Sequence, residues 1–177
     1  CSRCVGAITS FLDTFEFDEF IAAKALLLLQ LYHQQVIDEE PSLSHYSQAK
    51  FMASQAAPLY IAVGLPEGAA GILMDCSWGA VQMKLLDRNG MQSLADRLEV
   101  VMLSFKEWDL PDFRMQFYEL VGLTQLACLY RGLQTQKKAS QCFPKLKQAL
   151  AHPKQWLSRA CKARNLLAAW DIKIDDP

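Results

Sequence analysis

The chain has 177 residues, of which 51% are hydrophobic and 21% are charged, a balance that is typical of globular proteins and excludes a disordered one. Its net charge is −1, but the charges are sorted along the sequence. Residues 1–130 hold eight basic and sixteen acidic residues, whereas residues 131–164 hold nine basic residues and no Asp or Glu. This distribution favours attraction of an anionic partner to the C-terminal third.

The length suits one domain with a substantial core, so we expect residues 1–177 to form a single helical domain. The chain begins at Cys1 with neither an initiator Met nor a signal peptide, which favours a fragment of a longer protein. No run of eighteen apolar residues is present, and therefore no membrane span is predicted.

Apolar residues recur at three- and four-residue steps almost throughout the chain, which predicts helices and no strands. The first half is expected to hold four helices, at 5–15, 17–37, 42–63 and 66–88. Pro41 ends the second helix, while Pro58 lies inside the third and Gly64 closes it. The many small residues of the fourth helix predict that another helix packs closely against it.

In the second half, Asn89-Gly90 is expected to stop the fourth helix, because both residues favour left-handed backbone. A fifth helix is predicted over 91–108 and a sixth over 113–136. A loose connection then leads to a short helix opened by Pro144, and Pro153 opens the last helix. The expected fold class is all-α, with seven or eight antiparallel helices in one array or in a helical-repeat solenoid.

Seven residues of the second half fall at the packing positions of a known helical repeat: Leu123, Leu126, Ala127, Tyr130, Ala139, Phe143 and Leu146. The segment resembles a single tetratricopeptide repeat. The resemblance covers one repeat length, and Pro144 stands where the second helix of such a repeat is continuous. No second copy is present, so the resemblance indicates a repeat-like helix pair and assigns no family.

Residues with chemical potential are few. Cys1-x-x-Cys4 has the spacing of half a zinc site, but this chain offers no second close pair, so no metal is predicted unless residues outside the chain complete the site. The histidines His33, His45 and His152 are interpreted as a helix-end cap, a first-turn residue and a linker residue. No nucleotide, hydrolase, metalloprotease or calcium-binding motif is present. We therefore predict a non-catalytic protein without a cofactor.

The tryptophans and methionines, among them Met102 and Met115, occur at helical spacing beside Leu and Val. This pattern favours core packing ahead of a cofactor site or a peptide groove.

The basic stretch is the best candidate for a binding surface. On the last predicted helix, the inward stripe consists of Trp156, Ala160, Ala163, Leu167 and Trp170, which leaves the basic residues toward water. Lysines outnumber arginines six to three, and because a lysine lacks the bidentate fork, base-specific readout of nucleic acid is not indicated. The predicted partner-binding residues are Lys137, Lys138, Lys145, Lys147, Lys154, Arg159 and Lys162.

The sequence thus predicts an intracellular scaffold or adaptor domain, cytoplasmic or nuclear, whose basic surface contacts an acidic protein segment or a phosphate backbone. A solvated basic face is the plainer explanation of the same residues. A secreted helical signalling protein held by disulfides is an alternative, although Cys76, Cys128 and Cys161 lie among apolar residues and no Asn-x-Ser/Thr sequon is present. A second alternative is a domain that binds a small ligand in a pocket near the fourth helix.

Overall fold

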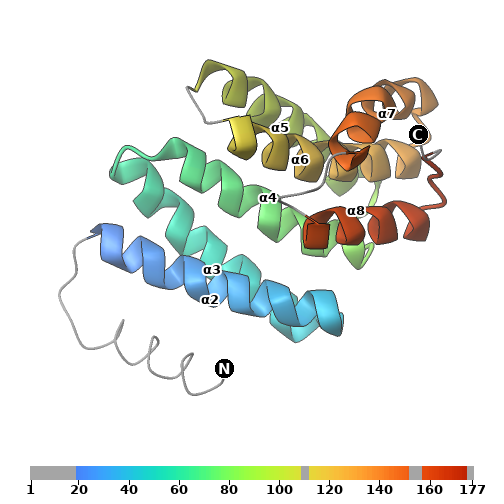
Figure 1. Cartoon of the computed structure of the whole chain (residues 1–177). Helices are drawn as coiled ribbons and strands as arrows, with labels where there is room; N and C mark the ends of the chain where they lie inside the picture. Colours follow the sequence, from blue (N-terminus) through green and yellow to red (C-terminus); the bar gives the residue numbers. More distant parts are fainter. Residues whose placement is uncertain (1–18, 109–111, 152–156, 175–177) are drawn as a thin grey trace. The chain divides into compact units, whose positions relative to one another are not determined.

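The computed structural model describes residues 19–108, 112–151 and 157–174. Every regular element within these ranges is an α-helix, so the all-α prediction is confirmed. The helix expected at 5–15 lies outside the described residues, as does Lys154. The helices are α2 (Glu19–Glu39), α3 (Leu43–Ala62), α4 (Pro66–Gln82), α5 (Arg88–Glu107), α6 (Asp112–Gly132), α7 (Gln136–Ala151) and α8 (Leu157–Ala169) (Figure 1).

The chain divides into two compact units, Cys1–Gly79 and Ala80–Pro177, called here unit 1 and unit 2. Unit 1 holds α2, α3 and most of α4, and unit 2 holds the end of α4 and the helices α5 to α8. The single domain over 1–177 and the antiparallel or solenoid arrangement stay predictions. None of the described helices is sufficiently long and apolar to pass through a membrane.

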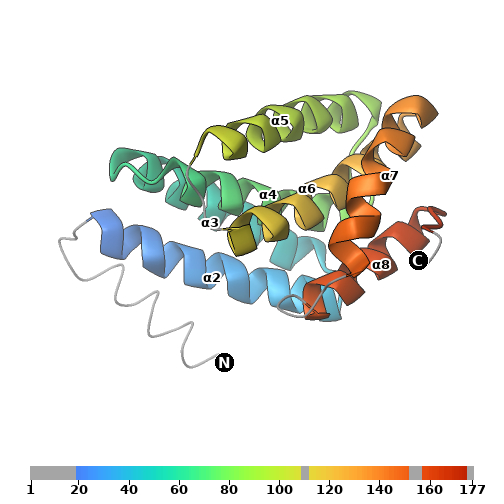
Figure 2. The same ribbon diagram turned by 45° about the horizontal axis from the view of Figure 1, so that its top comes forward.

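In unit 1, α2 and α3 pack side by side (Figure 2). Their shared core is built from small residues and one aromatic ring, including Ala23, Ala56 and Tyr60. The next helix approaches through a glycine, because a Cβ atom on Gly68 would lie 2.4 Å from a ring carbon of Tyr60. The close packing predicted from the small residues of the fourth helix is confirmed at this position.

Turn residues set the helix ends of unit 1 largely as predicted. Gly64 adopts a left-handed backbone, with φ of 75°, just after α3, and Pro66 is the first residue of α4. Pro58 lies inside α3 as expected. Ser42 occupies the N-cap position of α3, but its side chain makes no capping hydrogen bond. The left-handed backbone that glycine allows and the fixed φ of proline therefore carry most of the boundary information here.

The junction of α4 and α5 differs from the prediction. α4 ends at Gln82 instead of near Arg88, and Asn89 and Gly90 lie in the first turn of α5. The cause is the N-cap residue Asp87, whose Oδ1 accepts a hydrogen bond of 2.7 Å from the backbone N–H of Gly90. A capping carboxylate thus outweighs the left-handed preference of Asn-Gly.

α6 is the central helix of unit 2. It packs against α5, α7 and α8, and every residue from Leu120 to Tyr130 is buried. The residues that carry the tetratricopeptide resemblance lie in the packed pair of α6 and α7, and all of them except Phe143 are buried. α6 therefore provides the surface on which its neighbouring helices rest.

The prediction of a loose connection before Pro144 is wrong, since α7 continues through this residue. The buried face of α7 consists of Ala139, Cys142, Leu146 and Leu150. Burial of this face against α6 outweighs the one backbone hydrogen bond that a proline removes. Lys137 and Lys138, expected in the connection, consequently lie in the first turn of α7.

The C-terminal end of α8 is tied to the rest of unit 2 by Trp170. The indole Nε1 donates a hydrogen bond of 3.2 Å to the carbonyl oxygen of Val81. The ammonium group of Lys84 lies 5.2 Å from the centre of the indole ring and donates a bond of 2.8 Å to the carbonyl of Ala169. A Cβ atom on Gly132 would approach this ring to 2.7 Å, so only glycine leaves room for it.

Candidate functional site

The basic side chains of α7 point in several directions. Lys138 and Lys145 are seven residues apart, which is close to two helical turns, so they lie on the same side of the helix. Lys147 follows Lys145 by two residues and therefore lies about 200° around the helix axis. The lysines of α7 therefore do not all share one side of the helix, and Lys138 and Lys145 stand out because they do.

Lys138 joins α7 to α5. Its Nζ atom lies 3.1 Å from Oε1 of Glu99 and 5.2 Å from the ring centre of Tyr130 on α6. The hydroxyl of Tyr130 donates a short hydrogen bond to the same carboxylate oxygen. This bond and the nearby ammonium lower the pKa of Glu99, whereas burial and the Glu99 carboxylate raise the pKa of Tyr130. One carboxylate therefore links three helices.

Lys145 makes a looser contact. Its Nζ atom lies 3.8 Å from Oε1 of Glu119 on α6, and the two side chains are 57% and 34% exposed. An ion pair of this length and exposure contributes little to stability. Both lysines of this side of α7 thus face carboxylates from residues 1–130, which is the acidic part of the sequence.

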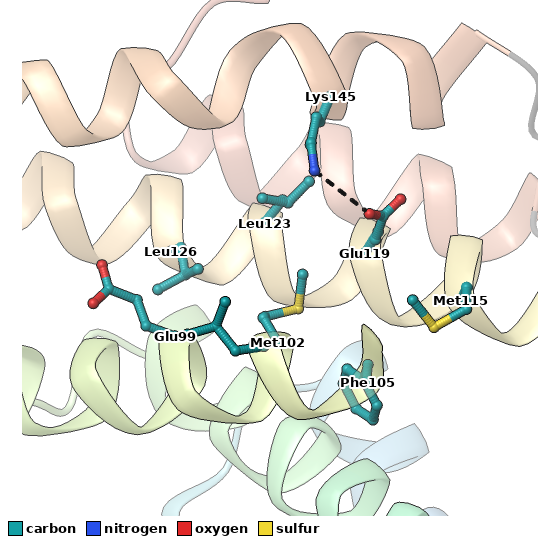
Figure 3. Close-up of a pocket in the computed structure, with 9 residues that line it drawn as sticks. Glu99, Met102, Phe105, Met115, Glu119, Leu123, Leu126 and Lys145 are labelled. Carbon is teal, nitrogen blue, oxygen red and sulfur yellow. Dashed lines mark ion pairs between the residues drawn. The ribbon is translucent and has the colours of Figure 1, made fainter. Parts of the chain in front are cut away.

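An apolar cavity of about 300 Å³ lies beside Glu99 and the Lys145–Glu119 ion pair (Figure 3). Its apolar lining comes from α5 and α6: Met102, Leu103, Phe105, Met115, Leu123 and Leu126. Glu99, Glu119 and Lys145 supply the polar part of the lining. The volume is about twice that of an apolar protein cavity of 150 Å³ that holds one benzene ring. The cavity can therefore take two large apolar side chains, but not a helix backbone.

Two aliphatic side chains of α5 are exposed to solvent. Val100 and Leu103 are 63% and 61% exposed, and because they are three residues apart they lie on one face of α5. Leu103 also lines the cavity. We call the cavity, these two side chains and the ion pairs of Lys138 and Lys145 the groove.

The other predicted basic residues lie outside the groove lining. Lys137 and Lys147 belong to α7, and Arg159 and Lys162 belong to α8. Arg159 lies with its guanidinium carbon 5.6 Å from the ring centre of Phe117. The predicted inward stripe of α8 is confirmed at Ala160, Ala163 and Leu167, which are buried. Trp170 is half-buried, and Trp156 lies outside the described residues.

Two histidines that the sequence treats separately are in contact in unit 1. Nδ1 of His33 and Nδ1 of His45 lie 2.9 Å apart, and the ring centres lie 5.2 Å apart. With the two Nδ1 atoms this close, the ring centres are farthest apart when the two nitrogens point at each other. The observed distance between the ring centres is close to that maximum, so the contact has the geometry of an N–H···N hydrogen bond. The interpretation of His33 as a helix-end cap is therefore wrong, because its ring joins α2 to α3 instead.

This contact predicts a loss of stability in mild acid. Burial and the charge of His45 lower the pKa of His33 from its ordinary value of 6.5, so below about pH 6.5 the unfolded chain binds more protons than the folded one. The denaturant concentration at the unfolding midpoint should therefore decrease when the pH is lowered from about 7.5 to about 5.5. The hydrogen bond itself contributes about 0.5–1.5 kcal/mol to the free energy of unfolding. His33→Asn should flatten this pH dependence, and an unchanged slope in this variant would contradict the assignment.

The described cysteines, Cys76, Cys128, Cys142 and Cys161, are free. Burial raises the pKa of Cys76 and of Cys142 to about 11, and it also raises the pKa of Cys128, so these thiols stay protonated at neutral pH and are poor nucleophiles. Cys161 is exposed, contrary to the apolar setting expected for it. Across the described ranges, no three His, Cys, Asp or Glu residues are placed to hold a metal ion. Cys1-x-x-Cys4 lies outside those ranges.

Sequence reasoning missed the groove. The cavity is lined by residues of α5, α6 and α7, whereas the pocket expected near the fourth helix stays a prediction. Met102 and Met115, interpreted as core residues, are half-buried and line it. The one available signal was their flexible, apolar side chain, which is common at adaptable binding surfaces.

No protein-family model, curated protein or solved structure matches this chain. Function is therefore inferred from the chemistry of the groove and not from similarity to a known protein.

Proposed function

We propose that the chain is a non-catalytic helical scaffold or adaptor domain that binds another protein through the groove of unit 2. The observation that carries the proposal is an apolar cavity whose lining includes the exposed side chain of Leu103, with the exposed Val100 one turn away on the same face of α5. Burial of a partner's apolar side chain in such a cavity excludes water from both surfaces and is the usual source of affinity at a protein interface.

The chemistry of the rim supports an acidic segment as the partner's contact. The side chains of Lys138 and Lys145 are 48% and 57% exposed. An ammonium group carries three N–H donors, and one carboxylate does not occupy all of them. Glu99, in contrast, already accepts bonds from both Tyr130 and Lys138. Both ammonium groups therefore keep N–H donors that a carboxylate of the partner can use, beside the acceptor oxygens that Glu99 and Glu119 keep.

The remaining basic residues support long-range attraction. Lys137, Lys147, Arg159 and Lys162 lie in a stretch of sequence without acidic residues, and their field speeds the approach of an acidic partner. A phosphate backbone would meet the same charges but would leave the apolar cavity unused, so a protein partner is favoured. Free thiols at the described cysteines support an intracellular setting, cytoplasmic or nuclear.

Leu103→Asp tests the proposal. Because Leu103 is 61% exposed, the variant should keep its stability within about 0.5 kcal/mol. A charge in the mouth of the cavity should nevertheless weaken partner binding by about 30-fold or more. The measurement is affinity purification of crosslinked complexes with the full chain as bait, followed by titration of each identified partner against the wild type and the variant.

Lys147→Glu is the matched control, since it changes charge on the other side of α7. It should slow association modestly and retain the complexes. If Leu103→Asp retains every partner of the wild type, the groove is not the binding site. A small molecule that raises the melting temperature of the wild type but not of Leu103→Asp would favour the ligand-binding alternative.

A further inference from the structure

We infer that His33 and His45 form a two-histidine site in unit 1 that binds a zinc ion. The inference goes beyond the proposed function, because it concerns unit 1 and not the groove of unit 2. Three observations carry it: the contact between the two Nδ1 atoms, the distance between the ring centres, and the packing of the two helices that hold the rings.

The two imidazole rings direct a nitrogen atom toward the same point. Nδ1 of His33 and Nδ1 of His45 lie 2.9 Å apart, so one of them donates the proton of the hydrogen bond and the other accepts it with its lone pair. A neutral imidazole is the form that binds a metal ion, and burial together with the charge of His45 lowers the pKa of His33, which favours this form at pH 7. A zinc ion takes the place of the shared proton. That proton leaves to solvent while Nε2 of the same ring takes up another, so both rings stay neutral.

The distance between the ring centres fits a tetrahedral ion. Zinc–nitrogen bonds of about 2.0–2.1 Å at a tetrahedral angle place two imidazole ring centres about 5.2 Å apart and their ligating nitrogens about 3.3 Å apart. The ring centres of His33 and His45 already lie 5.2 Å apart. Each ring therefore has to turn by only about 35° in place, which the broad χ2 torsion of histidine permits, and neither helix has to move. Ligands at 90°, as in square-planar copper sites, would need ring centres about 4.5 Å apart, which is a poorer fit.

The helices α2 and α3 hold the two rings in this arrangement. His33 belongs to α2 and His45 is the third residue of α3, and the two helices pack side by side (Figure 2). The ring of Tyr32 lies edge-on to both, with its centre 5.2 Å from that of His33 and 6.5 Å from that of His45. Because the two donors are held together before the ion arrives, binding by the second nitrogen is intramolecular, and the pair binds zinc more tightly than either ring alone.

The other zinc positions are open to water. Both histidines are partly exposed to solvent. Within the residues that the structure describes, no third His, Cys, Asp or Glu lies where it would complete a ligand set with them. A structural zinc site has four protein ligands, so this site should bind zinc more weakly than such a site does. Zinc should therefore stabilise the folded chain when it saturates the site, without being required for folding.

The inference is tested by titrating the full chain, with ¹⁵N-labelled histidines, with zinc chloride at pH 7. Nuclear magnetic resonance of the ring nitrogens should show the Nδ1 signals of His33 and His45 shifting together and saturably, while the signals of His152 stay unchanged. Total zinc uptake does not decide the question, because thiols of the chain also bind zinc. The histidine signals report the site itself.

Substitution of one ring measures the contribution of the pair. In His33→Ala, the zinc affinity read from the remaining His45 signal should fall by at least about 100-fold, since the second donor is lost. His45→Ala, followed through the His33 signal, should show the same loss. His152→Ala is the matched control and should keep the affinity of the wild type. Circular dichroism checks that each variant retains its helices.

Two results would overturn the inference. The first is a wild-type titration in which the Nδ1 signals of His33 and His45 do not shift, whether or not zinc binds elsewhere in the chain. The second is a His33→Ala variant that keeps the affinity of the wild type at His45. If a variant fails to fold, the titration of the wild type decides alone. Neither result bears on the groove, so the proposed function stands or falls separately.

Discussion

Replacing Phe105 by Ala is expected to lower the free energy of unfolding by about 3–5 kcal/mol. Phe105 is only 2% exposed. Its ring stacks on Tyr118 at 4.3 Å between ring centres and meets Trp108 edge-on at 5.3 Å. The substitution removes this burial and both ring contacts where α5 packs on α6, and it leaves a void beside the groove. Urea unfolding followed by tryptophan fluorescence measures the effect.

Leu103→Ala is the control for this prediction. Leu103 lies on the same helix and also lines the groove, but it is 61% exposed, so its truncation should change stability by no more than about 0.5 kcal/mol. A loss smaller than about 1 kcal/mol for Phe105→Ala would mean that α5 is not packed on α6 through this ring.

Replacing Trp170 by Ala should lower the free energy of unfolding by about 3 kcal/mol. The change removes the hydrogen bond to Val81, the indole face under the Lys84 ammonium and the packing against Gly132. Hydrogen exchange should show that the amides of α8 lose protection more than those of α6, because the ring ties the end of α8 to its neighbours.

Trp170→Phe separates the parts of this interaction. Phe keeps an aromatic ring near Gly132 and Lys84 but has no N–H group for Val81, so it should cost about 1 kcal/mol. An equal loss for the Phe and Ala variants would show that the hydrogen bond alone holds α8, which contradicts the packing described.

Helix number and type could be predicted from the sequence, because the three- and four-residue period of apolar residues reports which side of each segment is buried. Helix boundaries could be predicted where one residue's own backbone preference sets them, through the left-handed conformation of Gly64 and the fixed φ of Pro66. Helix boundaries could not be predicted where a neighbouring group sets them. The Asp87 side chain starts α5 ahead of Asn-Gly, and burial of one face carries α7 through Pro144.

The candidate site was predictable only in part. Sequence composition pointed to the basic stretch and to Lys138 and Lys145, but not to the carboxylates that face them. Glu99 precedes Lys138 by 39 residues and lies on a different helix. Periodicity also could not distinguish core from groove at Met102, because it identifies the apolar face of a helix and not whether a neighbouring helix covers that face.

The methionines offer the most direct measurement of partner binding in the groove. Met102 and Met115 line it, while the other methionines of the chain, Met52, Met74, Met83 and Met91, do not. The full chain with ¹³C-labelled methionine methyl groups is titrated with each partner that affinity purification identifies. Binding in the groove predicts saturable shifts of the Met102 and Met115 methyl signals that Leu103→Asp abolishes, with little change at the other four. Binding that shifts only those four signals, or none, would contradict it.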